Sequence, residues 1–153
     1  MGKTRQLIEH IIAYLKEHLP PRLSKENLPL PSGYEYGDLT TVSLTLLPRI
    51  GVDIYKYPQQ QATVGPNGLL RQKRLGLVWI AVGASDKETT ARLLHDYADI
   101  VAEVLNGDYQ AGGLSLILQV TEVDFTPTAP WETKLLRTAR LQLSLWTQHH
   151  RLH

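Results

Sequence analysis

Apolar residues recur at two different spacings along this chain, and the spacing separates predicted helices from predicted strands. The N-terminal segment repeats them every three or four positions, which predicts a helix over residues 1–19; the apolar positions are Leu7, Ile8, Ile11, Ile12 and Leu15. Thr4 offers a capping side chain. Pro20 and Pro21 predict the end of this helix, because proline lacks the N–H donor and disfavours helical backbone before it.

The next part of the chain changes from irregular to alternating. Residues 20–38 hold four prolines and show little periodicity, so they predict an extended connector. Apolar residues at every second position then predict strands over 39–47 and 51–57. A polar segment over 58–68 predicts a hairpin loop, and the nearly continuous apolar run 75–82 predicts a strand covered on both faces.

A second helix is predicted over residues 86–106. Ser85 is the expected N-cap and Glu88 completes a capping box with it. The buried stripe of this helix should comprise Leu94, Ala98, Val101 and Leu105.

Two long strands should follow the second helix. In the first of them the apolar residues stand at even-numbered positions up to Val120 and at odd-numbered positions from Val123. This change of parity predicts a bulge or twist near Thr121-Glu122. The second should turn Leu141, Leu143 and Leu145 inward and leave Arg140, Gln142, Ser144 and Trp146 on the other face. Residues 149–153 read as a frayed tail.

These elements predict one α+β domain over residues 1–153. Its sheet, within 39–148, should be mixed and mainly antiparallel, with about four to five strands and with the helices packed on one face. A length of 153 residues fits a single domain.

Composition narrows the classes of function. The formal net charge of +1 gives no global argument for nucleic-acid binding, so any such contact would be local. The absence of cysteine excludes disulfides, thiolate metal sites and cysteine nucleophiles. No apolar run approaches the ~20 residues that span a bilayer, so we expect no membrane contact and a cytoplasmic place of synthesis.

No set of residues predicts catalysis, a metal or a cofactor. His149-His150-x-x-His153 resembles a metal cluster but lies beside no carboxylate, so a solvated tail is the simpler interpretation. His95 and Asp96 are neighbours on a helix and should not face each other. Glu122 and Asp124 share a strand face and could bind a metal, although alternation alone accounts for them. We therefore expect a protein that is not an enzyme.

The only local concentration of charge is Arg71, Lys73 and Arg74, close to the polar run Gln59, Gln60 and Gln61. These residues could contact nucleic-acid phosphates, or they could be the charged edge of a strand that discourages aggregation. All six residues are candidates for an interface.

Two tryptophans are further interface candidates. Trp131 lies in a proline-rich connection, and Trp146 lies on the polar face of the last strand. Tryptophan is enriched where proteins meet, although both residues could instead pack under a loop or against the first helix.

The order of elements, together with the segments GVDIYKYP, VWIAVGASD, VTEVDFTPTAP and KLLRTARLQLSLWTQ, resembles the tail terminator and tail-completion (neck) proteins of long-tailed bacteriophages. The resemblance covers about residues 39–148. It implies a structural virion protein, assembled in the host cytoplasm, that forms a hexameric ring and has no catalytic residues. Its implied partners are the tail tube protein and the head-tail connector protein, with non-specific contact to DNA passing through the lumen as a further option.

From a different class, the alternative is a nucleic-acid-binding accessory domain that uses the patch of Arg71, Lys73 and Arg74.

Overall fold

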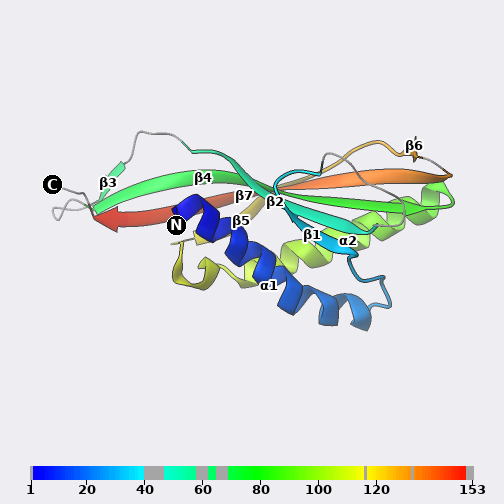
Figure 1. Ribbon diagram of the computed structural model, residues 1–153, viewed down its shortest axis with the longest axis horizontal. Coiled ribbons are helices and arrows are strands. Elements are labelled where there is room, and N and C mark those ends of the chain that lie inside the picture. The colour runs from blue at the N-terminus through cyan, green and yellow to red at the C-terminus, as the bar shows by residue number, and fades with distance from the viewer. Residues whose placement is uncertain are drawn as a thin grey trace.

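The computed structural model describes residues 2–39, 47–57, 62–64, 69–115, 117–131 and 133–150 (Figure 1). The side chains of 62–64, 69–70 and 148–150 are outside this description. The helices are α1 (Lys3–Lys25), α2 (Lys87–Gly107) and the short 3-10 helix η2 (Ala111–Gly113). The strands are β1 (Gly33–Tyr36), β2 (Arg49–Lys56), β3 (Ala62–Val64), β4 (Leu69–Ala84), β5 (Ile117–Phe125), β6 (Ala129–Trp131) and β7 (Lys134–His150).

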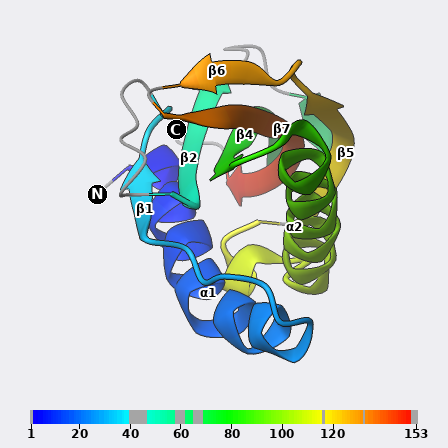
Figure 2. The ribbon, with the colours of Figure 1, turned by 90° about the vertical axis from the view of Figure 1, so that its right-hand side faces the viewer.

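The sheet is mixed and mostly antiparallel. Its continuous path runs β1-β2-β4-β7-β5, with the short strand β3 paired to β4 and the short strand β6 paired to β7. The β1–β2 pair is parallel, and the other pairs are antiparallel. Both α1 and α2 pack on the same side of the sheet (Figure 2). The predicted α+β class, with helices on one face, is confirmed.

The core lies between the two helices and the sheet. β4 and β7 pair along 16 consecutive positions, and every second residue points toward the helices. The buried strand residues on this side include Ile50, Val52, Val78, Ile80, Val82, Leu141, Leu143 and Leu145. The predicted inward residues of the last strand are thus confirmed, and full burial of such a side chain contributes roughly 1.5–3 kcal/mol.

Helix α1 is longer than the sequence predicts. It continues through Pro20 and Pro21 to Lys25, so the prediction that it ends at residue 19 is wrong. Leu19 and Leu23 are both 0% exposed and extend the apolar stripe of the helix beyond Leu15 by about two turns. Because this burial outweighs the hydrogen bonds that proline removes, the helix persists.

The start of α1 and the segment after it also differ from prediction. The N-cap is Gly2, with no side-chain cap, so Thr4 does not cap the helix. The predicted connector 20–38 contains the last turn of α1 and the edge strand β1. Tyr34, opposite Ile50 of β2, packs against the core, which gives this proline-rich segment a place in the sheet. Most of the predicted strand 39–47 is not described by the structure, because residues 40–46 lie outside the described residues.

Helix α2 begins one residue later than predicted. Asp86, not Ser85, is the N-cap: its Oδ1 accepts from the Thr89 backbone N–H at 2.8 Å. A carboxylate is a strong acceptor at the positive end of the helix dipole, so it displaces the neighbouring serine. The predicted stripe of α2 is buried at all four positions, which are Leu94, Ala98, Val101 and Leu105.

The predicted bulge in β5 is confirmed. Val120 pairs with Leu143 and Glu122 pairs with Gln142, so Thr121 is the extra residue. The bulge places Val123 opposite Leu141, on the helix side of the sheet.

The backbone of β7 continues farther than predicted. Its pairing with β4 extends to His150, so the tail predicted over 149–153 begins as strand. Antiparallel pairing with β4 gives the backbone N–H and C=O groups at this end of β7 hydrogen-bond partners. In a frayed tail these groups would bond to water instead.

Candidate interaction surface

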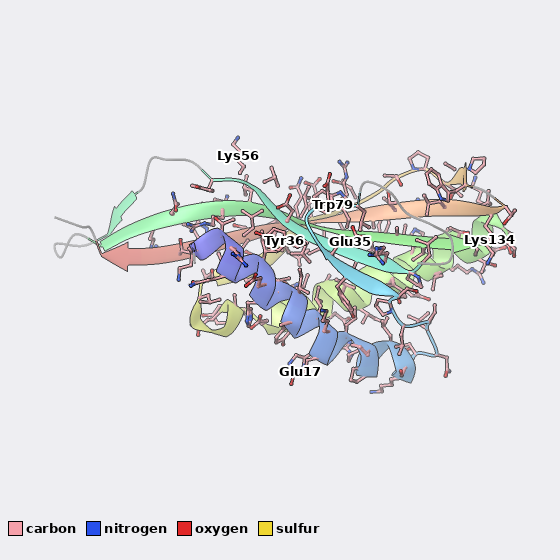
Figure 3. The ribbon with its side chains drawn as sticks, viewed as in Figure 1. Glu17, Glu35, Tyr36, Lys56, Trp79 and Lys134 are labelled. Carbon is pink, nitrogen blue, oxygen red and sulfur yellow. The ribbon has the colours of Figure 1, made fainter. Side chains whose placement is uncertain are left out.

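The face of the sheet turned away from the helices carries aromatic and charged side chains. On β4 the positions that alternate with the buried ones are Leu75, Leu77 and Trp79, all half-buried. The run 75–82 is fully buried on the helix side, whereas on the other face Ala81 is buried and Leu75, Leu77 and Trp79 are half-buried, so the predicted covering on both faces is incomplete. No described helix packs over this second face, which we call the open face (Figure 3 labels Trp79).

One end of the open face forms a basic–aromatic hollow. Its lining residues are Arg71, Tyr109, Gln110, Ile117 and Trp146, around a cavity of about 370 Å³.

Strand pairing explains how these side chains meet. Trp146 of β7 lies between Lys73 of β4 and Ile117 of β5 in one cross-strand row. Lys73 Nζ is 5.8 Å from the centre of the Trp146 ring, within range of a cation–π contact. Arg71 is two residues before Lys73 and therefore shares its face.

The turn between α2 and β5 brings Tyr109 to this hollow, and several polar contacts hold the turn. Asp108 Oδ2 lies 2.6 Å from His10 Nε2 on α1, and Asp108 Oδ1 accepts from the Gly112 N–H at 3.2 Å. Ser115 Oγ donates to the Trp146 carbonyl at 2.6 Å, which ties the turn to β7. Tyr109 is thus positioned by both the helix layer and the sheet.

The same environment affects the tyrosine beside His10. Burial, followed by the charges of Asp108 and Glu17, raises the pKa of Tyr14 above its ordinary value. Tyr14 therefore stays neutral and packs against the His10 ring, with 6.0 Å between ring centres.

Arg74 does not belong to this hollow. It lies on the helix side of β4, 8% exposed, because adjacent strand residues point to opposite faces. Its guanidinium donates to Thr147 Oγ1 at 2.6 Å and to Thr4 Oγ1 at 3.3 Å, and it lies over the Tyr57 ring. Burial lowers the pKa of Arg74, and the charge of Tyr57 opposes that shift. The predicted three-residue basic patch is therefore corrected to Arg71 and Lys73.

Trp131 lies at the opposite end of the sheet, on β6 (Figure 1). It is 38% exposed and shares a hollow of about 430 Å³ with Trp79 and Leu136. The two predicted tryptophans therefore mark two separate places on the molecule.

An acidic hollow lies on the helix layer. Its charged residues are Glu26, Asp96, Asp99 and Glu103, with Arg22 as the single cation. Leu28 and Ile100 form its apolar part, and the cavity measures about 230 Å³. Arg22 pairs with Glu103, so the remaining carboxylates give the hollow a net negative charge.

The other residues considered for chemistry are dispersed. His95 and Asp96 are both exposed, and the His95 ring meets the edge of Phe125 at 4.8 Å between centres. Glu122 and Asp124 pair across the strands with Gln142 and Arg140. Gln59, Gln60 and Gln61 lie outside the described residues.

Among the described residues, no group of three or more His, Cys, Asp or Glu side chains could hold a metal ion. No helix in those same ranges is long and apolar enough to cross a membrane.

The sequence prediction missed Tyr109 and Ile117, which are 54% and 43% exposed. A large aromatic directly after the end of a helix, in an otherwise polar turn, was a signal for Tyr109. Ile117 offered no such signal, because it reads as one member of an apolar strand.

The chain was also compared with known proteins. No protein-family model matches it, and no curated protein does either.

Proposed function

We propose that this protein is a structural subunit of a long-tailed bacteriophage virion, forming an oligomeric ring that ends the tail tube and joins it to the head-tail connector. The observation that carries the proposal is the asymmetry of the fold. Both helices cover one face of the sheet, whereas the open face presents Trp79 and Trp146 without a covering helix in the described structure.

The shape of the sheet supports an assembly role. β4 and β7 are 16 and 17 residues long, and they extend past the helix layer at the β3 end (Figure 1). A subunit with aromatic groups at both ends of a rigid sheet can contact different neighbours at each end.

Strand-to-strand association at the β5 edge is less suited to such contacts. Asn106 Oδ1 accepts from the Val120 N–H at 3.0 Å, and the Tyr109 carbonyl accepts from the Leu118 N–H. With the bulge at Thr121, these bonds leave a poor template for another strand. Contacts through side chains on the faces therefore fit the proposal better than extension of the sheet.

The second candidate is a nucleic-acid-binding accessory domain. It rests on Arg71 and Lys73 beside Trp146, because basic and aromatic groups together suit a stacked base and its phosphate. It is weakened by Arg74, which lies on the other side of the sheet.

Light scattering during size-exclusion chromatography, combined with a pull-down on purified tail tubes, tests the first proposal. We expect a single oligomer of closed stoichiometry, or a monomer that becomes multimeric on the tube end. A strict monomer that also fails to bind tubes would contradict the proposal. Salt-sensitive oligonucleotide binding by that monomer would favour the second candidate.

A further inference from the structure

The basic–aromatic hollow has the composition of an interface centre. Tyr109 and Ile117 are large and exposed, Arg71 and Trp146 line the hollow with them, and Lys73 lies beside Trp146 on the neighbouring strand. Aromatic and arginine side chains around a hollow are the groups that most often dominate binding energy. Among the described residues that line this hollow there is no carboxylate, so none of these residues neutralises its positive charge.

The acidic hollow has the complementary composition. Asp96 and Asp99 are exposed on α2, and Glu26 lies at the end of α1. Ile100 and Leu28 give it an apolar part that an aromatic side chain could cover.

The two hollows belong to different regions of the molecule. The basic–aromatic hollow lies near the β3 end, on the open face and the adjoining β5 edge. The acidic hollow joins the C-terminal end of α1 to the middle of α2, and that end of α1 lies away from β3 (Figure 1). One molecule therefore cannot satisfy both hollows by itself.

From this complementarity we propose that the basic–aromatic hollow of one copy docks on the acidic hollow of a second copy. Arg71 and Lys73 face the carboxylates of Asp96 and Asp99, while Tyr109 covers the apolar part of the acidic hollow. The inference rests on the proposed ring function, for which it names the contact between subunits.

Such a contact is heterologous, since two different surfaces meet and each copy still offers one free surface of each kind. Repetition of a heterologous contact closes into a ring when the rotation permits and otherwise grows a filament. A symmetric dimer through two basic–aromatic hollows is disfavoured, because it would place like charges against each other.

Charge reversal on either side tests the contact. R71E/K73E and D96K/D99K change exposed or half-buried side chains that form no ion pair with another described residue. Each double variant should weaken association by at least about tenfold, measured as the dissociation constant in sedimentation equilibrium. Circular dichroism and the melting temperature establish that each variant is folded.

Mixing the two double variants is the experiment that tests the contact most sharply. R71E/K73E keeps the acidic hollow and D96K/D99K keeps the basic–aromatic hollow, so an equimolar mixture retains one native contact per pair. The two reversed hollows are also opposite in charge to each other, so the mixture should regain assembly, whereas each variant alone should stay monomeric.

Matched controls separate a specific contact from a change in net charge. K87E/K134E makes the same charge change as R71E/K73E at exposed residues away from the hollow, and Figure 3 shows Lys134 at the far end of the sheet. E17K/D38K is the counterpart of D96K/D99K. Tyr109→Ala should weaken association, whereas Tyr36→Ala, at a similar exposure of 55%, should not.

Three results would overturn the inference. The wild-type protein could oligomerise or cap tubes while both charge reversals leave that assembly unchanged, which would spare the proposed function and reject this contact. The wild-type protein could also stay monomeric at every concentration. That result would reject the contact between copies, and the tube-capping assay would then be the test of the proposed function. A monomer that binds single-stranded oligonucleotide through Arg71 and Lys73 would assign the hollow to nucleic acid instead.

Discussion

Replacing Leu23 by alanine tests whether α1 continues through its two prolines. Leu23 is 0% exposed, against the core. Truncating a fully buried leucine costs about 2–5 kcal/mol, because it loses transfer free energy and leaves a cavity. In a domain of this size that loss lowers the melting temperature by roughly 4–20 °C.

The matched control is Leu30→Ala, in the segment after α1. Leu30 is 49% exposed, so its truncation should change the free energy of unfolding by no more than about 0.5 kcal/mol. Urea denaturation followed by far-ultraviolet circular dichroism measures both variants, with the slope against denaturant checked for constancy. If Leu23→Ala cost as little as Leu30→Ala, the helix would end at Pro20 and our account of the core would be wrong.

Three other predictions concern local geometry. Deleting Thr121 should remove the β5 bulge and leave a regular ladder in which Val120 and Val123 keep their face, because Val120 and Glu122 already pair with the consecutive residues Leu143 and Gln142; the free energy of unfolding by the same urea assay should change by less than about 1 kcal/mol, and a loss of about 2 kcal/mol or more would contradict this register. Gly112→Ala should destabilise more than Gly113→Ala: both have positive φ, but a Cβ at 112 would lie 2.6 Å from the His10 ring and one at 113 meets nothing within 4 Å; equal losses in thermal melts would refute that contact. Backbone and side-chain hydrogen bonds from Thr89 lower the pKa of Asp86 below its ordinary 3.8, so wild-type stability should fall as the pH drops below that value, and D86N should show a smaller fall in a pH series of urea melts.

The parts of the fold that sequence alone predicted are those fixed by local pattern. The change of parity around Thr121 can be read directly from neighbouring residues, and the stripe of α2 follows from helical spacing. The end of α1 could not be predicted in this way. Whether Pro20 and Pro21 end a helix depends on how deeply Leu23 is buried by distant strands, and that information is tertiary.

The interaction surface shows the same division. Alternation alone would have separated Arg74 from Lys73, since strand neighbours point to opposite faces. The meeting of Tyr109 with Trp146 could not be predicted, because it depends on a turn held by His10 across 98 residues of sequence. A hollow formed by three strands and a turn has no signature in any one of them.

Electron microscopy of tail tubes polymerised with and without this protein tests its proposed role most directly. Our account predicts a closed ring at one end of each tube and tubes that stop elongating once the ring is in place. Tubes that elongate equally in its presence and carry no additional density at either end would contradict it.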